Sequence, residues 1–323
     1  MKGIRIALMC AVLIGTQAFA QFSVTSPNSG DTLGKTNTIR FLIENITSQA
    51  RVVATATNNA KPNIRISTEA LLDPDADKRI LGTLDLNFDE TTESGTYTLQ
   101  VQYLTQGVVR DTRTITNLTI DTKNPKFRNV TPRSGSFVSV LVPVRAEVEE
   151  PGLDRWRVRV NDRDIPNNSG STTDIAVDWT TSNIENDGPA SITIKVDDKA
   201  RNSATKTINV TLDRVSPSSQ VKSPAGVSYR PTSIIPVVIE IADQYEGSVI
   251  AGGVNASLYT MDGQYIGRVA RRSATNSGAT LRWVGRIKGT SRLPKQFKMV
   301  VTAIDRAGNR AVDQTVTVNI SGR

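Results

Sequence analysis

Three short stretches decide the fold: VTSPNSG at residues 24–30, VTPRSG at 130–135 and VKSPAG at 221–226. Each has a Val just before a Ser-Pro or Thr-Pro pair, and each ends in a Gly. The three glycines are 105 and 91 residues apart. This period suits one β-sandwich per repeat and is far longer than a solenoid repeat. The pattern therefore predicts three domains in tandem.

The repeats also end alike, in IDTKNP at residues 120–125 and LDRVSP at 212–217. Proline fixes its own φ angle and holds the preceding residue in an extended conformation, so each end is expected to form a short, stiff joint. We place domain 1 at residues 21–121, domain 2 at 122–214 and domain 3 at 215–323. Such joints favour an elongated array of sandwiches.

Alternating apolar and polar residues in short runs between turn residues indicate an all-β protein. Residues 155–162, RWRVRVND, alternate in the way of a strand with one buried face. Asp262-Gly263 separates two further runs, 256–260 and 265–269. Asp-Gly between such runs is a strong hairpin signal.

A second pair of matching segments lies late in repeats two and three. DKARN at 198–202 corresponds to DRAGN at 305–309, each after a Trp, Trp179 or Trp283. Asp and Asn side chains bond the nearby backbone and Gly tolerates a positive φ, so both segments are predicted to be hairpin turns. The Asp-x-x-x-Pro joint, the late Trp and the Asp-x-Ala-Gly-Asn hairpin resemble the bacterial Ig-like repeats of secreted and surface proteins. The resemblance implies tandem immunoglobulin-like β-sandwiches. Repeat one, which has LTQG at 104–107 and no Trp, matches least.

Residues 1–20 have the three parts of a secretory signal peptide: Lys2 and Arg5, an apolar run over 6–14, and Ala18-Phe19-Ala20 before the cleavage point. The run is too short for a membrane anchor, and we expect no transmembrane segment after cleavage. The only cysteine, Cys10, falls inside this segment, so the mature chain has no disulfide. We expect a secreted or cell-surface protein, with the periplasm as the alternative.

Histidine is absent from the chain. The usual general base and the commonest metal ligand are thereby missing together, so we predict no catalytic residues and no enzyme activity. A glycoside hydrolase that uses two carboxylates without histidine is the remaining catalytic alternative. A concave site with two converging carboxylates would support it.

Charge is distributed unequally among the three repeats. Residues 21–121 have nine basic and twelve acidic side chains, residues 122–213 have thirteen of each, and residues 214–323 have fifteen against six. Most of the excess lies between Asp262 and Asp305, a stretch without acidic residues whose basic members are Arg268, Arg271, Arg272, Arg282, Arg286, Lys288, Arg292, Lys295 and Lys298.

These nine residues are our candidate polyanion-binding site, because a surface of one sign attracts acidic polymers and Arg binds phosphate and carboxylate with both arms of its fork. The alternative is that they solvate the outward faces of strands. We expect no specific nucleic-acid recognition, since Trp283 and Phe297 occupy positions that a sandwich buries, whereas base stacking needs exposed rings.

Two acidic patterns are candidate calcium sites. Asp73, Asp75 and Asp77 are spaced as at the start of a calcium loop, although Lys78 stands where the turn glycine belongs and Leu84 where the closing Glu belongs. This spacing leaves a loose calcium clip or a solvated turn. The joint and hairpin residues Asp121, Asp198, Asp213 and Asp305 are the second pattern, with turn capping as the alternative. Apart from calcium, no cofactor is expected.

These observations favour a secreted, non-catalytic structural or adhesive protein that acts as an extracellular spacer and interaction scaffold. Its expected partner is an extracellular or cell-surface protein or an acidic polysaccharide. The alternative is a module that binds a polyanion or glycan through the basic third domain.

Overall fold

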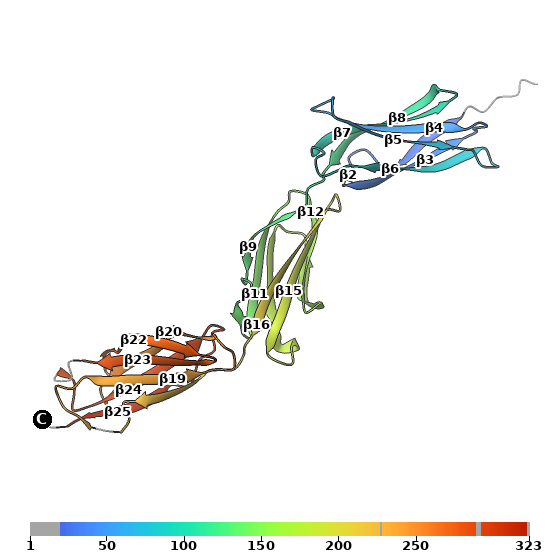
Figure 1. Cartoon of the computed structure of the whole chain (residues 1–323). Coiled ribbons are helices and arrows are strands. Elements are labelled where there is room, and N and C mark those ends of the chain that lie inside the picture. Colours follow the sequence, from blue (N-terminus) through green and yellow to red (C-terminus); the bar gives the residue numbers. More distant parts are fainter. Residues whose placement is uncertain (1–19, 227, 289–291, 322–323) are drawn as a thin grey trace, which may run out of the picture. The chain divides into compact units, whose positions relative to one another are not determined.

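The computed structural model describes residues 20–321, apart from residues 227 and 289–291 (Figure 1). The signal-peptide prediction therefore lies outside the described residues, except for Ala20. The described residues form strands joined by turns, among them the short 3-10 turn Thr181–Asn183, and they contain no α-helix. This confirms the all-β prediction. The described residues contain no helix that is long and apolar enough to cross a membrane.

The first sandwich contains eight strands. They are β1 (Gln21–Ser26), β2 (Thr32–Leu33), β3 (Thr36–Glu44), β4 (Ala50–Asn58), β5 (Arg65–Leu72), β6 (Arg79–Asn87), β7 (Gly95–Thr105) and β8 (Val108–Ile120). One sheet has the order β1-β3-β6 and the other β2-β8-β7-β4-β5.

The second sandwich repeats this arrangement with β9 (Lys126–Thr131), β10 (Phe137–Val138), β11 (Leu141–Glu149), β12 (Leu153–Val160), β13 (Arg163–Gly170), β14 (Asp174–Thr180), β15 (Gly188–Asp198) and β16 (Ser203–Leu212). Its sheets have the orders β9-β11-β14 and β10-β16-β15-β12-β13. Every strand has the same neighbours as its counterpart in the first sandwich.

The third sandwich has one strand more. It contains β17 (Ser218–Ser223), β18 (Ser228–Tyr229), β19 (Ile235–Ala242), β20 (Val249–Tyr259), β21 (Tyr265–Arg268), β22 (Ala270–Ser277), β23 (Thr280–Ile287), β24 (Gln296–Asp305) and β25 (Gln314–Ile320). The orders are β17-β19-β23-β22 and β18-β25-β24-β20-β21, so β22 is the added edge strand.

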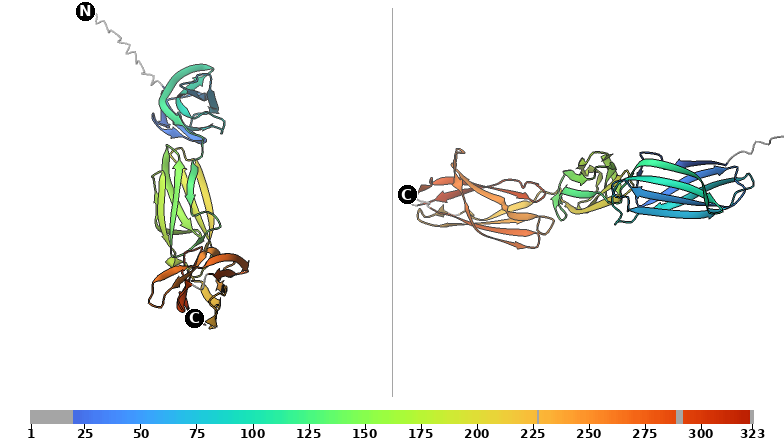
Figure 2. Two further views of the ribbon diagram at one scale, coloured as in Figure 1. Left: turned by 90° about the vertical axis from the view of Figure 1, so that its left-hand side faces the viewer. Right: turned by 90° about the horizontal axis from the view of Figure 1, so that it is seen from above.

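The repeated openings explain how each first strand changes sheets. Pro27, Pro132 and Pro224 follow cis peptide bonds. Each lies between a long strand that pairs antiparallel in one sheet and a two-residue strand that pairs parallel in the other. Two facing sheets with this shared strand order form an immunoglobulin-like sandwich. Figure 2 shows the paired layers from two further directions. The predicted fold, tandem immunoglobulin-like sandwiches, is confirmed.

Alternating side chains of the facing sheets fill three separate hydrophobic clusters, one in each sandwich. Trp179 of β14 and Trp283 of β23 are 0% and 2% exposed, and both belong to the sheet that contains the repeat's first strand. Phe297 is also fully buried. The expectation that the sandwich buries Trp283 and Phe297 is confirmed.

Residue contacts divide the chain into two units. Unit 1 comprises the residues up to Pro125 together with Asp197–Ser203, which form the β15–β16 turn. Unit 2 comprises residues 126–196 and 204–323. The second joint, at residues 212–217, therefore lies wholly within unit 2. Our boundaries at 121/122 and 214/215 stay a proposal.

Candidate functional sites: an acidic junction and a basic groove

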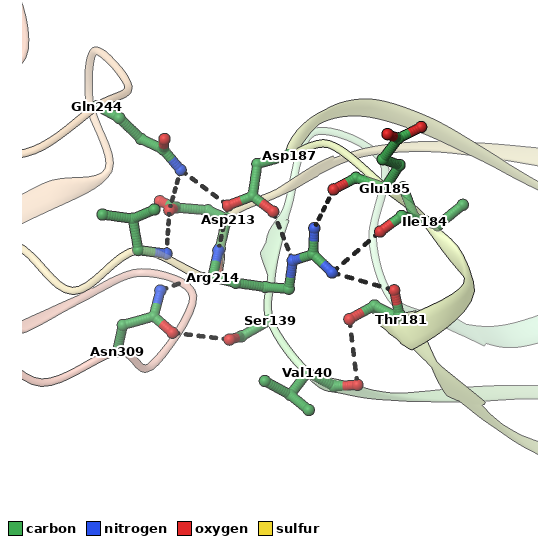
Figure 3. Close-up of polar contacts among 11 residues, drawn as sticks. Ser139, Val140, Thr181, Ile184, Glu185, Asp187, Asp213, Arg214, Gln244 and Asn309 are labelled. Atoms are coloured by element: carbon green, nitrogen blue, oxygen red, sulfur yellow. Dashed lines mark hydrogen bonds and ion pairs between the residues drawn. The ribbon is translucent and has the colours of Figure 1, made fainter.

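Arg214 fastens the second joint to the loop of the second sandwich that follows β14 (Figure 3). Its backbone N–H and its Nε donate to the two carboxylate oxygens of Asp187 at 2.7 and 2.6 Å. Its Nη1 donates to the carbonyls of Thr181 and Ile184, and its Nη2 donates to the Glu185 carbonyl. The guanidinium thereby satisfies three carbonyls and one carboxylate in a place that is largely removed from water.

Residues of the third sandwich reach the same joint. Gln244, just after β19, donates from Nε2 to Asp187 at 3.0 Å and to Oδ1 of Asp213 at 2.9 Å. Asn309 donates from Nδ2 to the Asp213 carbonyl at 2.8 Å, and its Oδ1 accepts a 2.7 Å hydrogen bond from Ser139 (Figure 3). We call Arg214, Gln244 and Asn309, together with the residues that they contact at this joint, the junction.

The predicted hairpin turn explains why Asn309 is available for this contact. Asp305 accepts hydrogen bonds from the N–H of Asn309 and from its Nδ2, both at 2.8 Å. Gly308 has φ 93°, which fits the expected left-handed turn residue. The Asn side chain is therefore held by its own turn while it donates to the joint.

The same turn chemistry occurs within unit 1. Asn202 donates from its N–H and Nδ2 to Asp198 at 2.8 and 2.9 Å, and from Nδ2 to the carbonyl of Asp121 at 2.8 Å. Burial raises the pKa of Asp198, hydrogen bonds from Asn202 lower it in part, and the negative charge of Asp121 raises it again. The pKa of Asp198 therefore lies above its usual value. Both hairpin predictions are thus confirmed in geometry.

Three carboxylates come together at the junction: Asp213, Asp243 and Asp305. One ligand oxygen from each lies within 4.8 Å of the others. Asp213 and Asp305 are buried, and Asp243 is half-buried. Burial raises the pKa of the Asp213 carboxyl, the Gln244 hydrogen bond lowers it, and the charges of Asp243 and Asp305 raise it again. The net direction is upward, because the ionised form is desolvated beside like charges.

The basic residues predicted as an anion site fall into two sets. Five of the nine, Arg268, Arg271, Arg272, Arg286 and Lys288, line one groove of about 510 Å³. β22 pairs with β23 so that Ala270 faces Arg286, and this added strand brings the arginines of neighbouring elements together. The apolar part of the lining comes from Leu258, Ile266, Val269, Ile287 and Leu293.

The other four predicted basic residues lie outside that groove. Arg282 faces Glu240 across β19 and β23, and Lys298 donates from Nζ to the Met261 carbonyl at 3.1 Å. Arg292 and Lys295 are exposed. The nine residues therefore divide into five that line the groove and four that lie apart from it. Their role in binding stays a prediction.

Asp73, Asp75 and Asp77 follow β5 in an exposed turn. Asp73 accepts a hydrogen bond from Gln49, Asp75 accepts the N–H groups of Asp77 and Arg79, and Asp77 forms an ion pair with Arg79. The described residues do not bring the three into one converging group. Each carboxylate has a partner typical of a solvated turn.

Two hollows among the described residues bear on the glycoside hydrolase alternative. The basic groove has no acidic residue in its lining. A hollow of about 1000 Å³ in unit 1 contains Asp31 and Asp85, which accept hydrogen bonds from the Asn28 N–H and the Thr38 hydroxyl. The carboxylate pair that the glycoside hydrolase alternative requires is therefore absent from the lining of the basic groove.

No protein-family model and no curated protein sequence matches this chain. Solved structures do resemble it. The fibronectin(III)-like modules of CbhA from Clostridium thermocellum are 13% identical, with a TM-score of 0.42 over 61% of this chain and 94% of theirs. The adhesin FdeC of Escherichia coli is 13% identical, with a TM-score of 0.37 over 95% of this chain and 98% of its own.

A calcium-stabilised, ice-binding adhesin of an Antarctic bacterium is 16% identical, with a TM-score of 0.31 over 95% of this chain and 75% of its own. All three scores are low, so the fold assignment depends on the strand order of this chain. That order defines a protein of tandem immunoglobulin-like sandwiches. Fold alone does not assign a function to such a protein.

Sequence reasoning singled out Asp213, Asp305 and the hairpin, but it missed Asp187, Asp243 and the contacts of Arg214. One signal was present: an acidic residue directly follows the corresponding strands β11 and β19, as Glu150 and Asp243. No comparable signal marks Asp187, whose partner Arg214 is 27 residues away.

Proposed function

We propose that this chain is an extracellular structural and adhesive protein whose immunoglobulin-like sandwiches serve as a spacer and an interaction scaffold. The junction is the observation that carries this proposal. Arg214, Gln244 and Asn309 connect the second joint to loops on both of its sides with directed hydrogen bonds. A free tether needs no such contacts, whereas a spacer that must hold successive modules does.

The proposal is tested by location and by attachment together. Intact cells that produce the native chain are labelled with an antibody against it, and the culture fluid is assayed in parallel. We expect the chain at the cell surface or in the fluid, and we expect a strain without it to attach to surfaces several-fold less. A chain confined to the cytoplasm, or unchanged attachment, would contradict the proposal.

A second function, binding of acidic polymers, is favoured by the basic groove. Five cationic side chains around an apolar lining can engage carboxylate or sulfate groups and the carbon skeleton between them. Such binding should weaken as salt rises, because ions screen exposed charges over about 10 Å at 0.1 M.

The groove is tested on a column of immobilised heparin, with the full chain and two charge-matched variants. One variant has Arg271, Arg272 and Lys288 replaced by Glu, and the control has Arg282, Arg292 and Lys295 replaced by Glu. We expect the groove variant to elute at markedly lower salt than the control. Equal losses would show that net charge alone retains the protein, and retention unchanged in both would exclude the site.

A further inference from the structure

We propose that Asp213, Asp243 and Asp305 form a binding site for a hard divalent cation of the calcium type. This inference is independent of the proposed function, because it concerns the chemistry of the junction and not a partner. The three residues come from different elements: the joint after β16, the residue after β19 and the last residue of β24. Their ligand oxygens nevertheless lie within 4.8 Å of one another.

An unpartnered oxygen supplies an independent observation. Asp213 is 0% exposed, and its Oδ2 has no hydrogen-bond partner among the described residues. Its Oδ1 is already used by Gln244 at 2.9 Å and by the Val215 N–H at 3.4 Å. Buried carboxylate oxygens without a partner are costly, and in native structures they point to a bound ion or water.

The charges at the site also require compensation. The ion pairs found among the described residues include none with Asp213, Asp243 or Asp305. Arg214 is adjacent in sequence, but its side chain donates to Asp187 and to the carbonyls of the 181–185 loop. Three carboxylates in a partly buried place repel one another, and a divalent cation relieves that repulsion.

The donor set selects the class of ion. All three donors are carboxylates, the ligands of hard cations, with no nitrogen or sulfur ligand in the group. Hydrogen bonds from Asn309 to Asp305, and from the Gln244 N–H and Ser248 hydroxyl to Asp243, orient these carboxylates. Each oxygen has a second lone pair available to an ion. Calcium accepts irregular sets of six to eight oxygens, whereas magnesium needs a near-ideal octahedron.

A bound ion would connect the joint to two segments of the third sandwich, the residue after β19 and the end of β24. Asp213 belongs to the joint, while Asp243 and Asp305 belong to the third sandwich. Since the site requires the folded junction, the ion should bind the native chain and not the unfolded one. Binding then raises the unfolding temperature by mass action.

The experiment uses the full mature chain freed of metal by chelation, titrated with CaCl2 and separately with MgCl2 in a calorimeter. Asp213→Asn removes the buried ligand, Asp243→Asn removes the half-buried one, and Asp174→Asn is the control at an exposed position of β14. We expect both ligand variants to bind one equivalent of Ca²⁺ fewer than the wild type, and the control to bind as the wild type does. We expect Mg²⁺ to bind at least tenfold more weakly.

Thermal unfolding separates a ligand role from a structural one. In saturating CaCl2 the wild type should unfold about 5 °C or more above either ligand variant. In EDTA, Asp213→Asn should unfold at or above the wild-type temperature, because the amide removes a repulsive charge and keeps the oxygen that Gln244 bonds. An Asp213→Asn variant that is destabilised equally in both buffers, or ligand variants that bind as much Ca²⁺ as the wild type, would overturn the inference.

Discussion

At the scale of single residues, Asp187 and Arg214 show how a buried ion pair is made favourable. Their side chains are only 12% and 25% exposed. Each of the three guanidinium nitrogens of Arg214 donates to at least one oxygen. A buried charge pair repays its desolvation only when such additional hydrogen bonds exist. The pair is therefore expected to contribute stability that an exposed pair does not.

Asp187→Asn should destabilise the protein by about 1.5–3 kcal/mol at pH 7, the range for hydrogen bonds to charged groups. Burial by itself raises the pKa of Asp187, but the hydrogen bonds from Arg214 and Gln244 and the charge of Arg214 together lower it by more, so the pKa lies below its usual value. A lowered carboxyl pKa contributes stability above the unfolded value of about 3.9, and that stability is lost as pH falls through the folded pKa.

The measurement is urea unfolding of wild type and Asp187→Asn between pH 7 and pH 2.5. The stability difference should be largest at neutral pH and should shrink below about pH 4. Asp178→Asn is the matched control, since Asp178 pairs with Arg145 at an exposed position where a pair contributes at most about 1 kcal/mol. A difference that does not depend on pH would rule out the ion pair as its source.

Which junction residues could be predicted depends on their separation along the chain. Asp305 and Asn309 are four residues apart, and turn chemistry alone relates them. Asp213 meets Gln244 across 31 residues and Asn309 across 96, distances over which only the completed fold brings side chains together. The acidic pattern therefore indicated Asp213 and Asp305 but gave no means to group them with Asp243.

At the scale of elements, the two hairpins differ at one position whose effect can be isolated. Gly308 has φ 93°, and Arg201 has φ 67° at the corresponding position. A Cβ added at Gly308 would meet no heavy atom within 4 Å, so only backbone conformation opposes a side chain there. Left-handed backbone costs a non-glycine residue roughly 1–2 kcal/mol.

We predict that Gly308→Ala lowers the free energy of unfolding by about 1 kcal/mol. Arg201→Gly should not lower it, and should raise it by up to about 1 kcal/mol. Chemical unfolding followed by circular dichroism measures both. If the two substitutions change stability in the same direction, backbone conformation is not what distinguishes the hairpins.

Strand prediction succeeded where side chains alternate and failed where pairing is brief. The runs at 155–162, 256–260 and 265–269 overlap β12, β20 and β21, and in β12 and β20 buried side chains alternate with more exposed ones as the runs predicted. The two-residue strands β2, β10 and β18 are too short to show a period. The exposed strand β22 has almost no buried side chains, so its pattern resembled a solvated loop and its role in gathering the arginines was not foreseen.

At the scale of the whole molecule, the graded charge and the repeated joints followed from the sequence, but the unequal chemistry of the joints did not. Arg214 of the second joint is held by five hydrogen bonds. Lys123 of the first joint is exposed, and only its backbone N–H has a hydrogen bond, to Asp121, among those described. Two joints that look alike in sequence therefore present very different basic side chains to solvent.

Trypsin, which cleaves after Lys and Arg, distinguishes the two joints in the intact chain. We predict that cleavage after Lys123 precedes cleavage after Arg214 by at least tenfold in rate, because Arg214 must leave its hydrogen bonds before a protease can bind it, whereas Lys123 needs little local opening. Mass spectrometry of timed digests identifies both cuts. Asp187→Asn should accelerate only the cut after Arg214, since it removes that residue's carboxylate partner without touching the first joint. Equal rates at both joints in the wild type, or acceleration of both cuts by Asp187→Asn, would mean that the hydrogen bonds of Arg214 do not protect the second joint.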